Sequence, residues 1–131
     1  MKYALDTNAL SDAVLLRGRV SERLRAQTRN SLYVPAQCVY EVHYGLARHQ
    51  VGAKRREAML RLIALCTVLP FDAKSAEIAG ALRADLERQG TPIGEMDGLI
   101  AATVMAHGAV LVSRNLREFA RVPTLALEDW Y

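Results

Sequence analysis

Several acidic residues stand where they could share one catalytic site. A short apolar run at residues 3–5 ends in Asp6, which is followed by Thr7 and Asn8. Aspartate is depleted in strands, and a carboxylate half removed from water is costly unless something pairs with it. In an open α/β sheet, ligands bind at the carboxyl ends of the strands. Asp6 ends the first predicted strand and is therefore a candidate for chemistry.

Two further acids lie on predicted helices. Glu41 borders an apolar helix face formed by Val39, Val42 and Leu46. Asp97 lies in the first turn of a helix, where an acid suits the helix dipole and can serve only as a cap. However, apolar residues follow Asp97 at i+3, i+4 and i+7. This spacing puts Asp97 on the buried stripe, which favours a functional role.

The type of these residues indicates metal chemistry. Carboxylates a few ångströms apart repel one another, and protonation or a bound cation must relieve the repulsion. Mg²⁺ and Mn²⁺ prefer carboxylate and water oxygens. The three histidines are scattered and form no zinc pattern with the two cysteines. Carboxylate-held Mg²⁺ beside a basic surface is suited to cutting phosphodiesters.

The elements that must position these acids alternate between strand and helix. Strands are predicted at 2–6, 31–34, 67–71, 109–113 and 124–130, and helices over most of the intervening chain, with Asp72 as an N-cap for 73–89. Strands separated by helices predict α/β topology, with a central parallel sheet flanked by helices on both faces. The run AVLVS is the apolar type that a buried parallel strand requires.

Length and composition predict one globular domain over residues 1–131, with 51% hydrophobic residues. Cys38 and Cys66 lack metal-binding spacing and are expected to be buried and reduced. No run has the length of a signal peptide or a membrane span. We therefore expect a cytoplasmic protein with no membrane partner.

Positive charge is concentrated in the first half of the chain. Residues 1–65 hold eleven Lys/Arg and five Asp/Glu, whereas residues 66–131 hold six and nine. Two basic helices contribute most of it, including Arg23, Arg25, Lys54 and Arg55. Such helices can be plain solvated faces, but together they favour a surface that binds a polyanion.

Four motifs in order resemble the PIN-domain family, and more narrowly the VapC toxins of bacterial VapBC toxin–antitoxin modules. The motifs are LDTN, PAQCVYE, PIGEMDGLIAA and LVSRNLREF with a terminal EDW, and they span essentially the whole chain. The resemblance implies a Mg²⁺- or Mn²⁺-dependent endoribonuclease that dimerises. It also implies a small VapB-type antitoxin partner whose C-terminal segment enters the acidic site.

By position, the resemblance assigns metal binding and catalysis to Asp6, Glu41, Asp97 and Glu118. Thr7, Ser113 and Asn115 fall where the family has polar neighbours of these acids, and Asn115 competes with Glu118 to complete the site. Arg114 and the basic helices would hold RNA. Glu95 lies outside the family pattern, so its role stays open.

Other classes fit less well. Phosphatases of the haloacid-dehalogenase type need a second Asp two residues after the first, where this chain has Asn8. Receiver domains need an acidic pair and a late lysine, and both are absent. A non-catalytic module that binds RNA or an antitoxin remains the alternative, and the RNA sequence that would be cut stays undetermined.

Overall fold

The computed structural model describes residues 1–131 as five strands and seven α-helices that alternate along the chain. The strands are β1 (Tyr3–Leu5), β2 (Leu32–Pro35), β3 (Thr67–Leu69), β4 (Val110–Val112) and β5 (Leu127–Glu128). The helices are α1 (Thr7–Val14), α2 (Val20–Arg25), α3 (Ala36–Arg48), α4 (Ala53–Leu65), α5 (Ala73–Arg88), α6 (Glu95–Ala106) and α7 (Leu116–Phe119), with a 3₁₀ turn at Arg29–Ser31.

All five strands are parallel and lie in the order β3-β2-β1-β4-β5. The predicted parallel sheet is therefore confirmed. β1 is central, and its Ala4 pairs with Tyr33 on one side and with Leu111 on the other. The chain moves to one edge through β2 and β3 and then crosses to the other side for β4 and β5. Between β1 and β4 the order reverses, and such a switch point opens a crevice at the carboxyl ends of the strands.

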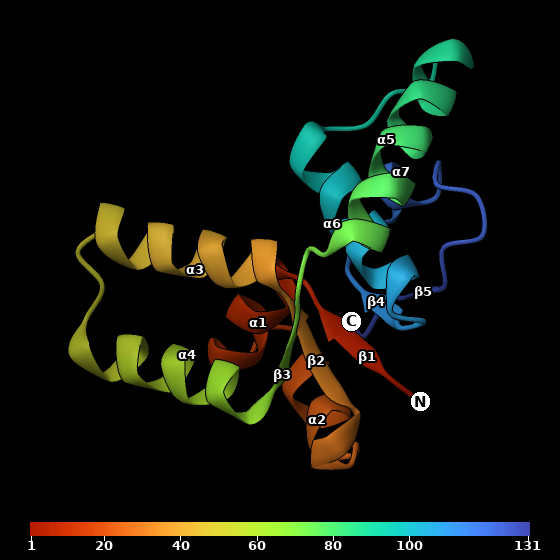
Figure 1. Cartoon of the computed structure of the whole chain (residues 1–131). Helices are drawn as coiled ribbons and strands as arrows, with labels where there is room; N and C mark the ends of the chain where they lie inside the picture. Colours follow the sequence, from red (N-terminus) through yellow and green to blue (C-terminus); the bar gives the residue numbers. More distant parts are fainter.

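Helices cover both faces of the sheet, as predicted (Figure 1). Helix α1 packs against α2, α3 and α4 in one layer, whereas α6 packs against α5 and α7 in the other. Right-handed crossovers produce this division, because the chain reverses its direction across the sheet after β3. Helices α3 and α6 also contact each other, so the two layers meet near the carboxyl end of β1.

The core lies between the sheet and these helices. Its largest fully buried side chains include Leu5, Leu10, Leu111, Phe119 and Trp130. Trp130 packs edge-on against Tyr3, with 5.2 Å between ring centroids. Both cysteines are free and buried, as expected.

Several predicted boundaries were too long. The chain between the first two predicted strands forms two short helices and a 3₁₀ turn, and the strand predicted over 124–130 is reduced to Leu127–Glu128. Pro35 ends β2 and is the N-cap residue of α3. The Asp72 cap is confirmed, because its carboxylate accepts a hydrogen bond of 3.0 Å from the Ser75 amide.

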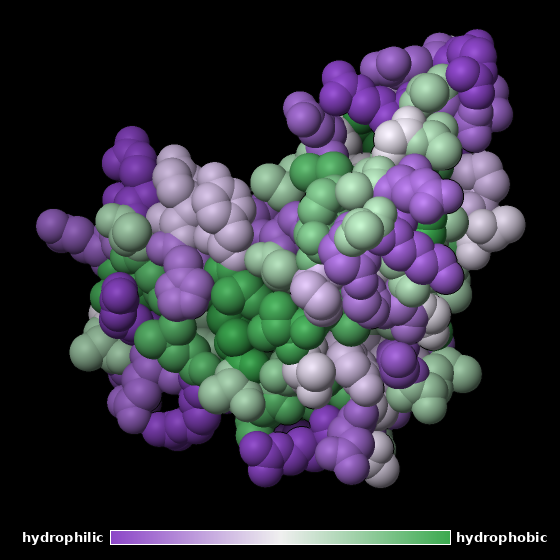
Figure 2. Space-filling model, viewed as in Figure 1, coloured by the Kyte–Doolittle hydropathy of each residue, from purple (hydrophilic) through white to green (hydrophobic).

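Hydrophobic side chains gather on the surface over β3 and α4 (Figure 2). Leu65, Val68 and Phe71 are exposed in this region because β3 is an edge strand. No helix in the structure combines the length and the apolar character needed to cross a membrane.

Candidate functional site

Asp6 lies at the carboxyl end of central strand β1 and is also the N-cap of α1. Its backbone N–H still bonds to Val112 in the ladder, at 3.2 Å. Its carboxylate accepts a 2.8 Å hydrogen bond from the Ala9 amide. The residue is only 6% exposed. The strand-to-helix turn thus gives this buried carboxylate a fixed direction.

Glu41 reaches the same region from α3. The Thr7 hydroxyl, in the first turn of α1, donates a 2.7 Å hydrogen bond to Glu41 Oε1. Glu41 is half-buried, on the border of the apolar face of α3 that buries Val42 and Leu46. The Thr7 bond joins segments 34 residues apart and links the first motif to the second.

Asp97 and Glu118 complete the acidic group from the other layer. Asp97 is half-buried in the first turn of α6, and Glu118 lies in α7 just after β4. Burial raises the pKa of the Asp97 carboxyl above its ordinary value, and the nearby charges of Glu118 and Glu41 raise it further. Glu118 Oε2 is fully buried and has no hydrogen-bond partner.

The four acids interact electrostatically. Burial is the main cause that raises the pKa of Asp6, and the charges of Asp97 and Glu41 add to it. Hydrogen bonds from the Ser113 side chain and the Ala9 amide oppose this rise. Like charges that raise one another's pKa values need a proton or a cation between them. The structure therefore brings the four predicted acids together at the carboxyl end of the sheet.

The donor set fits a hard divalent cation. It consists of carboxylates, and one of its oxygens, Glu118 Oε2, is buried without a partner. No three His, Cys, Asp or Glu side chains are grouped closely enough to hold a metal ion between them. Mg²⁺ commonly keeps several waters and is held by only one or two carboxylates. The arrangement suits an ion with few direct protein ligands better than a closed protein cage.

Ser113 and Asn115 form the turn between β4 and α7. Ser113 is buried, and its hydroxyl accepts a 2.9 Å hydrogen bond from the Asn115 amide. The Ser113 side chain also lowers the pKa of Asp6, so the two side chains lie close together. Asn115 occupies the N-cap position of α7 without capping it through its side chain. Ser113 thus supports Asp6 directly, whereas Asn115 contributes its backbone to the turn.

The predicted basic residues are dispersed. Arg55 lines a hollow of about 190 Å³ that also includes Thr7 and Glu41, so it faces the same hollow as one of the four acids. Lys54 lines a neighbouring hollow with Arg55. Arg114 is exposed next to Ser113 and stacks on the Tyr131 ring, with its guanidinium carbon 4.3 Å from the ring centroid.

The basic residues on α2 have other neighbours. Arg23 forms a 3.8 Å ion pair with Glu128 and lies over the Trp130 ring, whereas Arg25 is exposed. The predicted basic surface is therefore not one continuous patch around the acids.

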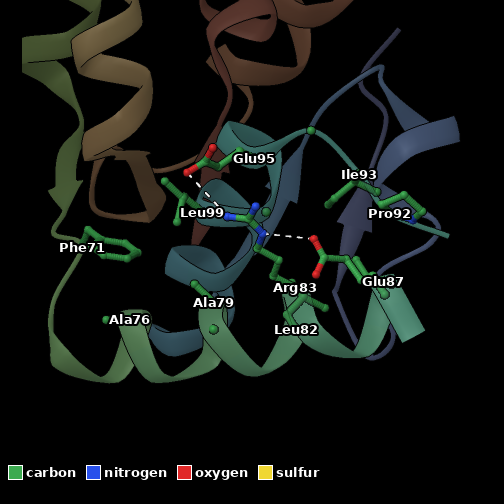
Figure 3. A pocket seen from close by; sticks show the side chains of 14 residues that line it. Phe71, Ala76, Ala79, Leu82, Arg83, Glu87, Pro92, Ile93, Glu95 and Leu99 are labelled. Carbon is green, nitrogen blue, oxygen red and sulfur yellow. Dashed lines mark hydrogen bonds and ion pairs between the residues drawn. The ribbon is translucent and has the colours of Figure 1, made fainter. Parts of the chain in front are cut away.

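Glu95 turns away from the acidic group. Its carboxylate pairs with Arg83 of α5 at 3.8 Å, and Arg83 also bonds to Glu87 at 3.3 Å. Figure 3 shows this pair across a pocket of about 290 Å³ between α5 and α6. The sequence left the role of Glu95 open, and in the structure this residue forms an exposed ion pair between α6 and α5.

Sequence reasoning predicted the burial of Cys38 but not its place beside the acids, and it missed the buried Gln37 and Thr103. Cys38 lies in the first turns of α3, and its thiol interacts with Thr7. Burial raises the pKa of this thiol, and the Asp6 charge raises it further. Gln37 and Thr103 are hydrogen-bonded to each other across α3 and α6. The sequence held a signal only for Thr103, which is the one polar residue in the otherwise apolar run 100–104.

The sequence is similar to known proteins along almost the whole chain. Residues 3–125 match the PIN domain. The tRNA(fMet)-specific endonuclease VapC of Salmonella typhimurium is 31% identical over 131 residues, which are 99% of this chain and 98% of the relative. Ribonuclease VapC2 of Haemophilus influenzae is 34% identical over 132 residues, with the same coverage of each chain.

Solved structures agree with the sequence relatives. VapBC2 from Rickettsia felis, bound to a DNA fragment from its promoter, superposes with a TM-score of 0.90 at 29% identity and covers all of both chains. DNA-bound VapBC from Salmonella typhimurium gives a TM-score of 0.89 at 31% identity, covering 100% of this chain and 99% of that one. The parallel sheet, the acids at its carboxyl edge and these full-length matches lead to one conclusion: the chain belongs to the PIN-domain family and, within it, to the VapC ribonucleases.

Proposed function

We propose that this chain is a Mg²⁺- or Mn²⁺-dependent endoribonuclease that acts in the cytoplasm as the toxin of a toxin–antitoxin module and inhibits translation. The observation that carries the proposal is the group of four interacting carboxylates, in which Glu118 Oε2 is buried without a partner. Such a group is unfavourable by itself and becomes favourable around a cation. Membership of the VapC ribonucleases supplies the substrate class.

Each acid has a distinct proposed role. Asp6 and Asp97 would hold the ion directly, because they are the two acids whose pKa values burial and neighbouring charge raise. Glu41 and Glu118 would orient waters around it and hold the proton that the attacking water gives up. When bound, Mg²⁺ or Mn²⁺ would activate water and stabilise charge on the phosphodiester.

Neighbouring hydroxyl groups keep these acids in position. Thr7 holds Glu41 through the 2.7 Å hydrogen bond, and the Ser113 side chain lies near Asp6 and lowers its pKa. Partners of this kind fix the direction of metal-binding groups. We assign RNA backbone contacts to Arg55, which shares a hollow with Glu41, and to the exposed Arg114, which follows Ser113. The dispersed Arg23, Arg25 and Lys54 are weaker candidates for the same role.

The first experiment is RNA cleavage by the purified chain with Mg²⁺, Mn²⁺ or EDTA. We expect defined fragments that vanish on chelation, and the loss of cleavage in Asp6→Asn and Asp97→Asn. Glu77→Gln is the matched control, because Glu77 is an exposed acid on α5. Transfer RNA is the first substrate to test, given the name of the Salmonella relative. A gel shift without cleavage would favour the non-catalytic alternative, and cleavage unaffected by EDTA would refute metal dependence.

The second experiment tests the toxin role. The related structures are VapBC complexes, which supports a VapB-type antitoxin as partner. Expression of this chain alone should stop growth, and co-expression with the small protein encoded beside it should restore growth and give a co-purifying complex. Growth that continues on expression of an active nuclease would refute the toxin role.

We also propose that the toxin forms a homodimer. Hydrophobic side chains exposed on α3, including Tyr40 and Tyr44, support this proposal. Light scattering of the purified toxin should give twice the chain mass, and the mass of a monomer would exclude the dimer.

A further inference from the structure

One buried polar contact links the two helical layers beside the site. Gln37 Nε2 lies 3.0 Å from Thr103 Oγ1, although the residues are 66 positions apart. Thr103 is fully buried and Gln37 is 9% exposed. The Thr103 hydroxyl donates its single hydrogen to the Leu99 carbonyl at 2.8 Å. It therefore accepts from the Gln37 amide, so both side chains have defined roles in the contact.

The contact joins the two helices that carry opposing acids. Gln37 lies in the first turn of α3, one helical turn before Glu41. Thr103 belongs to α6, whose first turn contains Asp97. No ion pair and no other pair of hydrogen-bonded side chains joins α3 and α6. A change in this contact would therefore alter how the two helices, and their acids, are held together.

Packing alone does not require polar side chains here. Thr103 stands among the buried apolar residues Ile100, Ala101, Ala102 and Val104. Apolar side chains of similar size would avoid the cost of removing an amide from water. In return for that cost, a hydrogen bond gives directional placement that apolar packing lacks. The force it must resist is also present, because Glu41 and Asp97 carry like charges and interact.

We propose that Gln37 and Thr103 are positioning residues that keep Glu41 at the distance from Asp97 at which it can orient water on the ion that Asp97 holds. This inference rests on the proposed metal-dependent nuclease. Neither residue touches the substrate or the ion. They act through α3 and α6, by keeping two mutually repelling carboxylates in place before the ion binds.

The variants Gln37→Met and Thr103→Val remove the hydrogen bond and keep a similar volume. Thr103→Ser keeps the hydroxyl and is the matched control. In a titration by calorimetry, we expect Mn²⁺ to bind the first two variants about tenfold more weakly, a typical cost of losing a group that orients a metal ligand. Cleavage should lose kcat to a similar extent with KM nearly unchanged, because RNA contacts are not altered. Thr103→Ser should match the wild type.

The double variant distinguishes one shared contact from two separate effects. If both residues act through the same bond, Gln37→Met with Thr103→Val should be no weaker than either single variant. The proposal would be overturned if the loss of Mn²⁺ affinity in the double variant equalled the product of the losses in the two single variants. It would also be overturned if the single variants lowered Tm but bound Mn²⁺ and turned over like the wild type.

A metal-free measurement separates this inference from the proposed nuclease. Gln37→Met should speed hydrogen exchange in the first two turns of α3, because Glu41 is then pushed away from Asp97. In an Asp97→Asn background, where the repulsion is absent, the same change should have a much smaller effect. Equal acceleration in both backgrounds would refute positioning, even if the wild type cuts RNA. If the wild type bound no Mn²⁺ and cut no RNA, the nuclease proposal would fail, and this exchange test would still decide the role of the contact.

Discussion

Replacing Asp6 with Asn should make the metal-free protein more stable. Burial and the charges of Asp97 and Glu41 raise the pKa of Asp6 above 3.8, so its ionised form is disfavoured in the folded state. Asparagine keeps the side-chain oxygen that caps α1 through the Ala9 amide, and Asn and Asp are equally good N-caps. The substitution therefore removes the charge and retains the cap.

The sign of the effect follows from proton linkage. A carboxyl whose pKa is raised on folding binds its proton more tightly in the folded state than in the unfolded state. The stability of the wild type therefore falls as pH rises from about 4 towards the raised pKa, and stays low above it. The neutral variant lacks this loss. The two proteins should be similar below pH 4 and differ at pH 7.

The magnitude can be estimated from general relations. Each pKa unit corresponds to about 1.4 kcal/mol. For a chain of this length, about 1 kcal/mol changes Tm by roughly 4 °C. We expect Asp6→Asn to unfold at a higher temperature than the wild type at pH 7 in EDTA, by roughly 4 °C for each 1 kcal/mol of charge burial that the substitution removes. Mg²⁺ at about ten times its Kd should add about 1.4 kcal/mol to the wild type, and little to the variant.

Thermal denaturation followed by circular dichroism tests this expectation at pH 4 and pH 7, with EDTA or Mg²⁺. Asp85→Asn is the control, because Asp85 is exposed on α5 and should respond like the wild type to Mg²⁺. An Asp6→Asn variant that is less stable than the wild type in EDTA at pH 7 would contradict the reasoning. Equal stabilisation of both proteins by Mg²⁺ would show that Asp6 does not hold the ion.

Three further predictions concern Thr7, the cysteines and Trp130. Thr7→Val should lower kcat by about tenfold because Glu41 loses the hydroxyl that orients it, whereas Thr7→Ser should stay active; equal activity of the two variants in an RNA cleavage assay would remove this role. Burial raises the pKa of the Cys66 thiol to about 11 and also raises that of Cys38. Ellman's reagent at pH 8 should therefore label neither cysteine until denaturant is added, and rapid labelling of the native protein would show that the thiols are accessible. Trp130→Ala should cost about 3–5 kcal/mol in chemical denaturation, because this fully buried ring packs on Tyr3; a cost below about 1 kcal/mol would mean that the C-terminal residues contribute little to the core.

The sequence by itself determined the element types and the main acids. Continuous apolar runs such as AVLVS predicted buried parallel strands, because hydrophobic periodicity is a local property. The position of Asp6 after a strand and of Asp97 on a buried stripe identified both as unusual carboxylates, because burying an unpaired charge costs free energy. The place of Glu41 at the border of an apolar helix face made it a candidate as well, whereas resemblance to PIN-domain proteins added Glu118.

The tertiary structure alone decided which side chains meet. The strand order, with β1 between β2 and β4, brings Asp6 beside residues that are distant in the chain. It also separated Glu95 from the acidic group by pairing it with Arg83, and it dispersed the basic residues that the sequence grouped by composition. The Gln37–Thr103 hydrogen bond had no local signature in Gln37, because its partner lies on another helix 66 residues away. Local patterns report how each residue suits its own helix or strand, whereas contacts between layers depend on the path of the whole chain across the sheet.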